Sequence, residues 1–212
     1  MNNKKAYIIT GPTASGKSGF AHALAVRIGG VIINCDSVQI YRNIENISAS
    51  PFANRPITDE IDGVPYRLFS VLPLSEQISV AEYIKMAHQE YEAAIAMGRI
   101  PIFVGGTGYY INGIINGIAE IPEISHENRM RAREMVANEL DMARRLVPNC
   151  TATDPQRIAR AVEVFLETGR HLNEWQNSAR MGAIEPTPFR ILINPPLDVL
   201  HKRIASRIPE MI

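Results

Sequence analysis

Short apolar segments recur along the chain and stop abruptly at glycine or polar residues. Residues 6–10 (AYIIT), 31–34 (VIIN) and 100–104 (IPIFV) are apolar and contain several β-branched side chains. They end at Gly11-Pro12, at Cys35-Asp36-Ser37 and at Gly105-Gly106, respectively. Segments of this length and composition, closed by turn residues, are typical of buried parallel strands.

Helical patterns separate these strands. One helix is predicted from Ser18 to about Ile28, and a second begins at Ser79, where Ser79 and Glu82 form a capping box, and stops at Gly98. Residues 41–75 show no clear period and are predicted to be loop with short elements. Strands that alternate with helices predict an α/β fold, in which helices flank both faces of a parallel sheet.

The section from residue 117 to residue 188 breaks this alternation. It predicts one helix from Glu127 to about Leu146, another from the Asp154-Pro155 cap to Gly169, and a short third helix near 171–179. A strand pattern resumes at 189–194 (FRILIN). We therefore expect residues 1–116 and 189–212 to form the α/β core and residues 117–188 to form an α-helical insertion. An amphipathic helix is predicted from about Leu197, and the chain stops within it, so we expect a truncated product.

Charge and cysteine content exclude several classes of protein. Among 212 residues, 22 Lys and Arg balance 22 Asp and Glu, which disfavours a protein whose whole surface binds polyanions. Two cysteines, Cys35 and Cys150, make neither a disulfide scaffold nor a zinc site. The first residues do not resemble a signal peptide, and no apolar run approaches the roughly 20 residues of a membrane span. We expect a cytoplasmic protein that does not enter the membrane.

A phosphate-binding loop follows the first predicted strand. The segment matches G-x-x-x-x-G-K-[ST] between a strand and a helix, and consists of Gly11, Pro12, Thr13, Ala14, Ser15, Gly16, Lys17 and Ser18. Its glycines let main-chain N–H groups turn towards phosphate oxygens, Lys17 adds a positive charge, and Ser18 can ligate Mg²⁺. The sequence therefore predicts that a diphosphate or triphosphate binds here with Mg²⁺.

The reaction depends on residues outside this loop. The strand at 100–104 ends in Gly-Gly-Thr, without the carboxylate that motor-type hydrolases use to organise Mg²⁺ and water. Asp36 instead follows the second strand, at the carboxyl edge where open α/β sheets bind ligands. In a small-molecule kinase such an aspartate holds or deprotonates the acceptor hydroxyl; as an alternative, Asp36 is a simple turn or cap residue.

Four segments in a fixed order carry a resemblance to one family. They are 11–18 (GPTASGKS), 36–42 (DSVQIYR), 104–107 (VGGT) and 154–164 (DPQRIARAVEV), with the helix start 200–204 (LHKRI) after them. Together they resemble the tRNA dimethylallyltransferase family, also called tRNA isopentenyltransferases. The resemblance covers essentially the whole chain and implies a P-loop NTPase-like core. Family members usually continue for roughly another 90 residues, in line with the expected truncation.

The resemblance implies a reaction and assigns catalytic residues to it. A dimethylallyl group would pass from dimethylallyl diphosphate to the exocyclic amine of the adenine 3′-adjacent to the anticodon in tRNA. The P-loop and Mg²⁺ on Ser18 would stabilise the leaving diphosphate. Asp36 matches the general base of the family, Thr13 matches a residue near the bridging region of the diphosphate, and Arg207 matches an arginine that reaches the diphosphate.

The same resemblance implies a set of contacts with the tRNA anticodon stem-loop, and a monomeric enzyme. The matching positions are Asp36, Ser37, Val38, Gln39, Thr107, Arg129, Gln156, Arg157, Ile158, Ala159 and Arg160. Because Arg133, Arg144 and Arg145 are interleaved with acidic residues, a solvated charged face is their simpler interpretation. For Trp175, packing between helices is favoured over stacking on a base.

The sequence departs from the family pattern at two places, and two alternative functions stay open. Residues 47–51 (ISASP) lack the lysine that the family often has there, and Tyr66 replaces a frequent histidine. One alternative is a P-loop kinase or an adenylate isopentenyltransferase, against which the 156–160 segment argues. The other is a truncated, inactive protein that still binds tRNA or a nucleotide.

Overall fold

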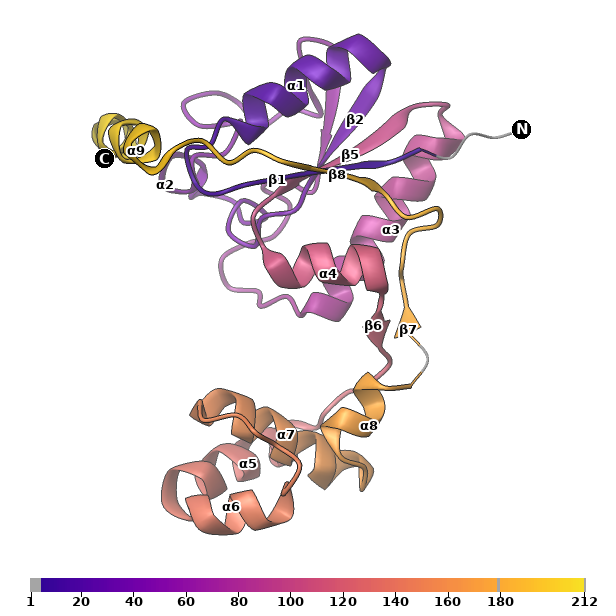
Figure 1. Ribbon diagram of the computed structural model, residues 1–212, viewed down its shortest axis with the longest axis vertical. Helices are drawn as coiled ribbons and strands as arrows, with labels where there is room; N and C mark the ends of the chain where they lie inside the picture. The colour runs from indigo at the N-terminus through magenta and orange to yellow at the C-terminus, as the bar shows by residue number, and fades with distance from the viewer. Residues whose placement is uncertain (1–4, 179, 212) are drawn as a thin grey trace. The chain divides into compact units, whose positions relative to one another are not determined.

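The central element of the computed structural model, which describes residues 5–178 and 180–211, is a six-stranded sheet (Figure 1). Its order is β3-β4-β2-β5-β1-β8, and all neighbouring strands are parallel except β3 and β4. The strands are β1 (Tyr7–Thr10), β2 (Gly30–Asn34), β3 (Glu60–Ile61), β4 (Val64–Arg67), β5 (Ile100–Gly105) and β8 (Phe189–Leu192). The predicted α/β class and the strands at β1, β2, β5 and β8 are thereby confirmed.

Helices cover both faces of the sheet because its central strands are apolar on both sides. Every residue of β2 is buried, and Figure 1 shows α1 on one face and α3 and α4 on the other. On the α1 face, Ile32 and Ile102 pack with Ala21 and Ala25 in one apolar cluster. The helices of this part of the chain are α1 (Lys17–Ile28), α2 (Glu45–Ser48), α3 (Val80–Ala96), α4 (Gly108–Asn116) and α9 (Leu197–Met211).

Local signals place the start of α3 as expected, and the 41–75 segment is loop with short elements, as predicted, namely α2, β3 and β4. The capping box is present, because Ser79 Oγ accepts from the Glu82 N–H at 3.2 Å and Glu82 Oε2 accepts from the Ser79 N–H at 2.8 Å. The position of β4 within the segment was not predicted; its first three residues are buried, and it pairs with β2. Pro65 obscured this strand, since proline is uncommon in strand interiors.

The chain divides into two units, one formed by Met1–Gly117 and Gly182–Ile212 and the other by Ile118–Met181. The second boundary lies before residue 182 rather than at 188, because residues after it bond to the α/β unit. The Ile184 N–H donates to the Ile114 carbonyl at 2.9 Å, and the Tyr91 hydroxyl donates to the Glu185 carbonyl at 3.0 Å.

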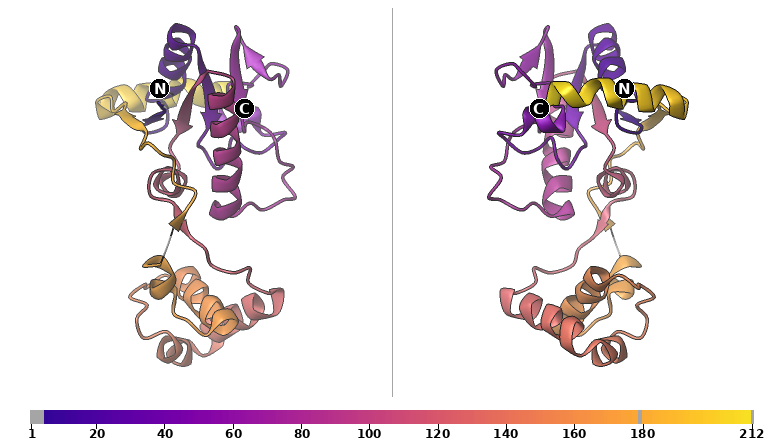
Figure 2. Two further views of the ribbon diagram at one scale, coloured as in Figure 1. Left: turned by 90° about the vertical axis from the view of Figure 1, so that its right-hand side faces the viewer. Right: turned by 90° about the vertical axis from the view of Figure 1, so that its left-hand side faces the viewer.

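The second unit is helical, apart from the pairing of two short strands, and Figure 2 shows its helices packed against one another. Its elements are β6 (Ile118–Ala119), α5 (His126–Asn138), α6 (Leu140–Leu146), α7 (Pro155–Thr168), α8 (Leu172–Gln176) and β7 (Arg180–Met181). The single helix predicted from Glu127 to Leu146 is wrong: Glu139, at φ −137° and ψ 50°, leaves the helical region and separates α5 from α6. None of the helices described is long and apolar enough to span a bilayer.

Candidate active site

The P-loop runs between β1 and α1 and adopts a backbone that few residues allow. Gly16 caps α1 with φ 94°, and Ala14 has φ 61°, so two of its residues lie at positive φ. The Ser15 N–H donates to the Pro12 carbonyl at 3.2 Å and closes the turn. A methyl group on Gly11 would overlap the Ile193 carbonyl and approach Ser15 Oγ to 2.9 Å. Glycine at residue 11 is therefore required for the loop to pass this close to the chain after β8.

Polar atoms of the loop are arranged for an anion. Ser15 is 3% exposed, and its Oγ has no hydrogen-bond partner in the described part of the chain. Lys17 Nζ donates only weakly, to the Pro12 carbonyl at 3.3 Å. Burial lowers the pKa of Lys17, the carboxylate of Asp36 opposes this, and the positive charge of Arg207 adds to the lowering. An unpaired buried hydroxyl and a partly desolvated ammonium are both stabilised by a bound phosphate group.

Three charged side chains lie near one another beside the P-loop. Lys17, Asp36 and Arg207 come from α1, the end of β2 and α9, and they lie close enough for Asp36 and Arg207 to shift the pKa of Lys17. Arg207 Nη2 donates to the Ala49 carbonyl at 3.0 Å, which places α9 beside α2 (Figure 1). Lys17 and Arg207 are the cations of this cluster and Asp36 is its anion.

Asp36 is fixed by a buried asparagine at the end of β2. Asn34 is fully buried; its Oδ1 accepts from the Asp36 N–H at 2.9 Å and its Nδ2 donates to the Asp36 carbonyl at 3.0 Å. One carboxylate oxygen of Asp36 accepts from the Val38 N–H at 2.9 Å. Asp36 is half-buried, so the carboxylate is positioned by the turn and retains an oxygen for another partner.

The end of β5 supports this turn from the neighbouring strand. Thr107 Oγ1 accepts from the Ser37 N–H at 2.9 Å, and the Thr107 N–H donates to the Cys35 carbonyl at 3.3 Å. A side chain at Gly105 would overlap the Cys35 carbonyl and approach the Asp36 nitrogen to 2.7 Å. Burial raises the pKa of the Cys35 thiol to about 12, so Cys35 is a packed thiol and not a nucleophile.

We expect Gly105→Ala to lower the free energy of unfolding by about 1–3 kcal/mol, the cost of overpacking, because rigid backbone must move to admit the methyl group. The shift falls on the turn that carries Asp36, so catalytic activity falls as well. Gly108→Ala is the matched control, since a methyl group there meets no atom within 4 Å. Denaturant unfolding of both variants gives the comparison, and equal stability would contradict the close approach of β5 to residue 35.

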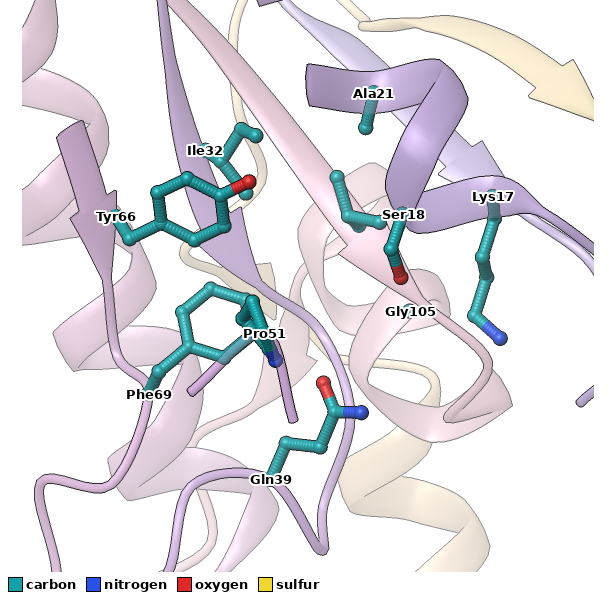
Figure 3. Close-up of a pocket in the computed structure, with 10 residues that line it drawn as sticks. Lys17, Ser18, Ala21, Ile32, Gln39, Pro51, Tyr66, Phe69 and Gly105 are labelled. Atoms are coloured by element: carbon teal, nitrogen blue, oxygen red, sulfur yellow. The ribbon is translucent and has the colours of Figure 1, made fainter. Parts of the chain in front are cut away.

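A mostly apolar pocket opens beside Lys17 and Ser18 (Figure 3). Its lining comes from α1, three strands and three loops and consists of Lys17, Ser18, Ala21, Ile32, Gln39, Pro51, Tyr66, Phe69, Val104 and Gly105. The Tyr66 hydroxyl lies 3.0 Å from His22 Nδ1, and burial raises the Tyr66 pKa to about 12, so this residue is a neutral phenol. Polar groups at one side and aliphatic and aromatic groups at the other suit a ligand with a charged head and a short apolar chain.

Gln39 and Thr13 occupy different parts of this region. Gln39 Nε2 donates to the carbonyls of Ser48 at 3.0 Å and Ala49 at 3.1 Å, so its side chain ties the Asp36 turn to the 48–51 segment. Val38 and Thr13 are exposed, the latter within the P-loop. The structure thus brings Asp36, Thr13, Arg207 and the P-loop into one region of the α/β unit.

The residues of the helical unit that are expected to contact tRNA are either accessible to solvent or buried. Gln156, Arg157 and Arg129 are exposed, and Arg160 forms an ion pair with Glu163 at 2.8 Å. Asp154 Oδ1 accepts from the Arg157 N–H at 2.9 Å and caps α7 as predicted.

Two residues of this set are buried. Ile158 and Ala159 are 1% and 9% exposed and pack in the apolar cluster shared by α5, α6 and α7, so their side chains support the fold of the unit. Trp175 is half-buried; its Nε1 donates to Thr168 Oγ1 at 3.2 Å and the Arg170 guanidinium lies 4.4 Å from its ring centre, in agreement with a packing role.

Three residues of the α/β unit received no individual role from the sequence: Asn34, and also Gly105 and Arg203, which lie within the segments 104–107 and 200–204 that carry the resemblance. Arg203 Nη1 donates to the carbonyls of Ala14 at 3.3 Å and Ser15 at 3.1 Å. Its i, i+4 spacing from Arg207 was an available signal. Asn34 offered only the signal that it stands at the end of a buried strand, whereas Gly105 also belongs to the 104–107 segment.

An α/β sheet with a P-loop, a carboxylate at the next strand end and a mostly apolar pocket beside Lys17 and Ser18 is typical of a P-loop enzyme acting on a phosphorylated substrate. Comparison with known proteins identifies the family. The IPP transferase family model matches residues 39–212, and the isopentenyl transferase model matches residues 4–65. The chain belongs to the IPP transferase family, and the transferase predicted from the sequence is confirmed.

Curated relatives and solved structures agree with this membership. The tRNA dimethylallyltransferase of Paramagnetospirillum magneticum is 39% identical over 98% of this chain and 67% of its own length, and that of Rickettsia bellii is 36% identical over 98% and 68%. A eukaryotic dimethylallyltransferase acting on tRNA superposes with a TM-score of 0.73 at 25% identity over 99% of this chain and 53% of its own. The tRNA isopentenylpyrophosphate transferase of Bacillus halodurans superposes with a TM-score of 0.60 at 27% identity, over 99% of this chain and 66% of its own. The chain spans about two thirds of the length of these curated relatives.

Proposed function

We propose that this chain transfers a dimethylallyl group from dimethylallyl diphosphate to the exocyclic amine of the adenine 3′-adjacent to the anticodon in tRNA. The names of the relatives support the reaction class. The observation in the structure that carries the proposal is that the Asp36 carboxylate lies close enough to Lys17 to raise its pKa, while Lys17 itself lines a mostly apolar pocket. A leaving diphosphate, a five-carbon chain and an amine each have a matching environment there.

The P-loop is proposed to hold the diphosphate as the allylic C–O bond breaks. Lys17, Arg207 and the loop N–H groups stabilise the charge that develops on the bridging oxygen, and Thr13 contacts the same region. The apolar side chains that line the pocket, including Ile32 and Phe69, are proposed to contact the five-carbon chain.

Asp36 is proposed to act as the general base. The adenine amine is a weak nucleophile because its lone pair is delocalised into the ring. The amine nitrogen bonds to the allylic carbon, the diphosphate leaves with the electron pair of the C–O bond, and the amine proton passes to the free oxygen of Asp36. Because Ser37, Val38 and Gln39 continue from Asp36 and Thr107 supports Ser37, this turn is proposed to receive the adenine.

Ser18 is proposed to be the residue that would hold Mg²⁺ when the diphosphate is bound. No group of three or more His, Cys, Asp or Glu side chains that could hold a metal occurs among the described residues, so the chain offers no complete cage. Ser18 is exposed at the pocket beside Lys17, and Mg²⁺ typically takes few protein ligands together with substrate phosphate oxygens. The ion would neutralise charge on the leaving diphosphate.

A single-turnover assay tests the proposed function. Labelled dimethylallyl diphosphate and an anticodon stem-loop are mixed with the chain in Mg²⁺, and the label should appear in the RNA at the adenine beside the anticodon. Label in free AMP would indicate an adenylate isopentenyltransferase, and RNA binding without transfer would indicate an inactive RNA-binding protein. Phosphoryl transfer from ATP to a small molecule would indicate a kinase.

The helical unit is proposed to bind the RNA through Gln156, Arg157, Arg160 and Arg129. All nine positions of this unit that carry lysine or arginine are arginine, a side chain that suits phosphate and base recognition. We expect Arg157→Ala and Arg160→Ala each to weaken stem-loop binding and to reduce the slope of log K against log salt by about one unit for each phosphate that is no longer neutralised, with no effect on diphosphate affinity.

Arg145→Ala is the control for this experiment, because Arg145 is exposed on α6, where Asp141 lies four residues earlier. Binding titrations at several salt concentrations give the slopes. An unchanged slope for the Arg157 and Arg160 variants would assign these arginines to a solvated charged face.

A further inference from the structure

Two arginines of α9 bond to the main chain of two different loops around the site. Arg203 Nη1 donates to the carbonyls of Ala14 and Ser15, and Arg207 Nη2 donates to the carbonyl of Ala49. We infer that Arg203 is a positioning residue, which holds the P-loop in its anion-binding conformation without itself contacting the diphosphate. The inference rests on the proposed function, since it concerns the same diphosphate.

The geometry of the peptide group supports this role. In a trans peptide the N–H points away from the C=O of the same unit, and the peptides after Ala14 and Ser15 are trans. Because both carbonyls face Arg203, the N–H groups of Ser15 and Gly16 face away from it. The guanidinium therefore lies on the carbonyl side of these two peptides, opposite their N–H groups, of which that of Ser15 closes the turn with the Pro12 carbonyl. Anions bind P-loops on the N–H side.

The contacts of Arg203 stabilise a strained part of the P-loop backbone. Ala14 has φ 61°, a conformation that is costly for a residue with a side chain and persists only where surrounding contacts hold it. Arg203 bonds the carbonyl of Ala14 and that of the next residue, which fixes two successive peptide planes. A methyl group at Gly16 would lie 3.7 Å from Arg203 Nη1, so the arginine packs directly against the loop.

Arg203 forms no ion pair with the acidic side chains that the structure describes. The ion pairs found among residues 5–178 and 180–209 are His22–Asp62, Arg67–Glu90 and Arg160–Glu163, and none includes Arg203. Its hydrogen-bonding capacity is therefore directed at the loop, 188 and 189 residues away in sequence.

The test compares Arg203→Met and Arg203→Lys with the wild-type chain. The first measurement is amide hydrogen exchange of Ser15 in the ligand-free protein, since this N–H bonds to the Pro12 carbonyl within the loop. The second is the affinity for inorganic pyrophosphate with Mg²⁺. We expect Arg203→Met to exchange Ser15 about tenfold faster and to bind pyrophosphate about tenfold more weakly, the effect of losing bonds from a charged donor.

The Arg203→Lys variant separates the effect of donor position from the effect of charge. Lysine keeps the charge but is too short to place a donor where Nη1 lies, so we expect Arg203→Lys to resemble Arg203→Met rather than the wild type. Across the variants, loop exchange and affinity should change together. Lys202→Met is the control for loss of a cation from the same helix, because Lys202 is exposed.

Three results would overturn the inference: weaker pyrophosphate binding with unchanged Ser15 exchange, faster exchange with unchanged affinity, or no change in either. Amide protection of Phe103, at the centre of the sheet, reports whether each variant is folded. The transfer assay on the wild-type chain reports separately on the proposed function, because a protein that binds pyrophosphate without prenylating RNA would refute that function and leave the role of Arg203 to be decided by its variants.

Discussion

We expect Asp36→Asn to reduce the single-turnover rate of prenyl transfer by about 10²–10⁴-fold, the range for general acid–base catalysis, with much smaller effects on the binding of either substrate. Asparagine keeps the shape of the side chain and an oxygen that can accept from the Val38 N–H, as Asp36 Oδ1 does at 2.9 Å. The turn is therefore preserved. The variant can orient the adenine amine, but it cannot take the proton.

Asp36→Ala should be comparably slow and should also bind RNA less well, because the amine then has no partner. Asp59→Asn serves as the control, since Asp59 is an exposed carboxylate outside the pocket lining. If Asp36→Asn kept a near-wild-type rate but lost Mg²⁺ affinity, Asp36 would be a metal-organising residue of the kinase kind. The proposed reaction would then have to be replaced by phosphoryl transfer.

We expect Lys17→Met to weaken dimethylallyl diphosphate binding by about 10- to 100-fold, as expected for the loss of a charged hydrogen bond, and to leave the fold intact. Lys17 is partly desolvated and, among the described residues, its ammonium donates only to the Pro12 carbonyl at 3.3 Å, so it contributes little to folding. In the bound state it supplies the central positive charge of the loop.

Calorimetric titration with dimethylallyl diphosphate measures this loss, and thermal unfolding checks the fold. Lys85→Met is the matched control, because Lys85 is exposed on α3 and outside the pocket. Undiminished diphosphate affinity in Lys17→Met would remove the P-loop from the proposed mechanism.

Features that depend on neighbours within about four residues could be predicted from the sequence. The capping box at Ser79 and the N-cap at Asp154 are present as expected, and the P-loop lies between a strand and a helix as predicted. Asp36 could be placed at the edge of the sheet because it directly follows a buried strand. These features have short-range causes: hydrogen bonds to the first turn of a helix, glycine at positive φ, and apolar residues at a fixed period.

Tertiary structure alone decided the contacts between distant segments. β4 became a sheet strand despite Pro65 because β2 offered it a parallel partner, and Glu139 ended α5 in spite of a continuing helical pattern. The need for glycine at residue 105 arises from Cys35, and the link between Arg203 and the P-loop spans 188 and 189 residues. No local pattern encodes such pairs, because each depends on where the folded sheet brings two backbones together.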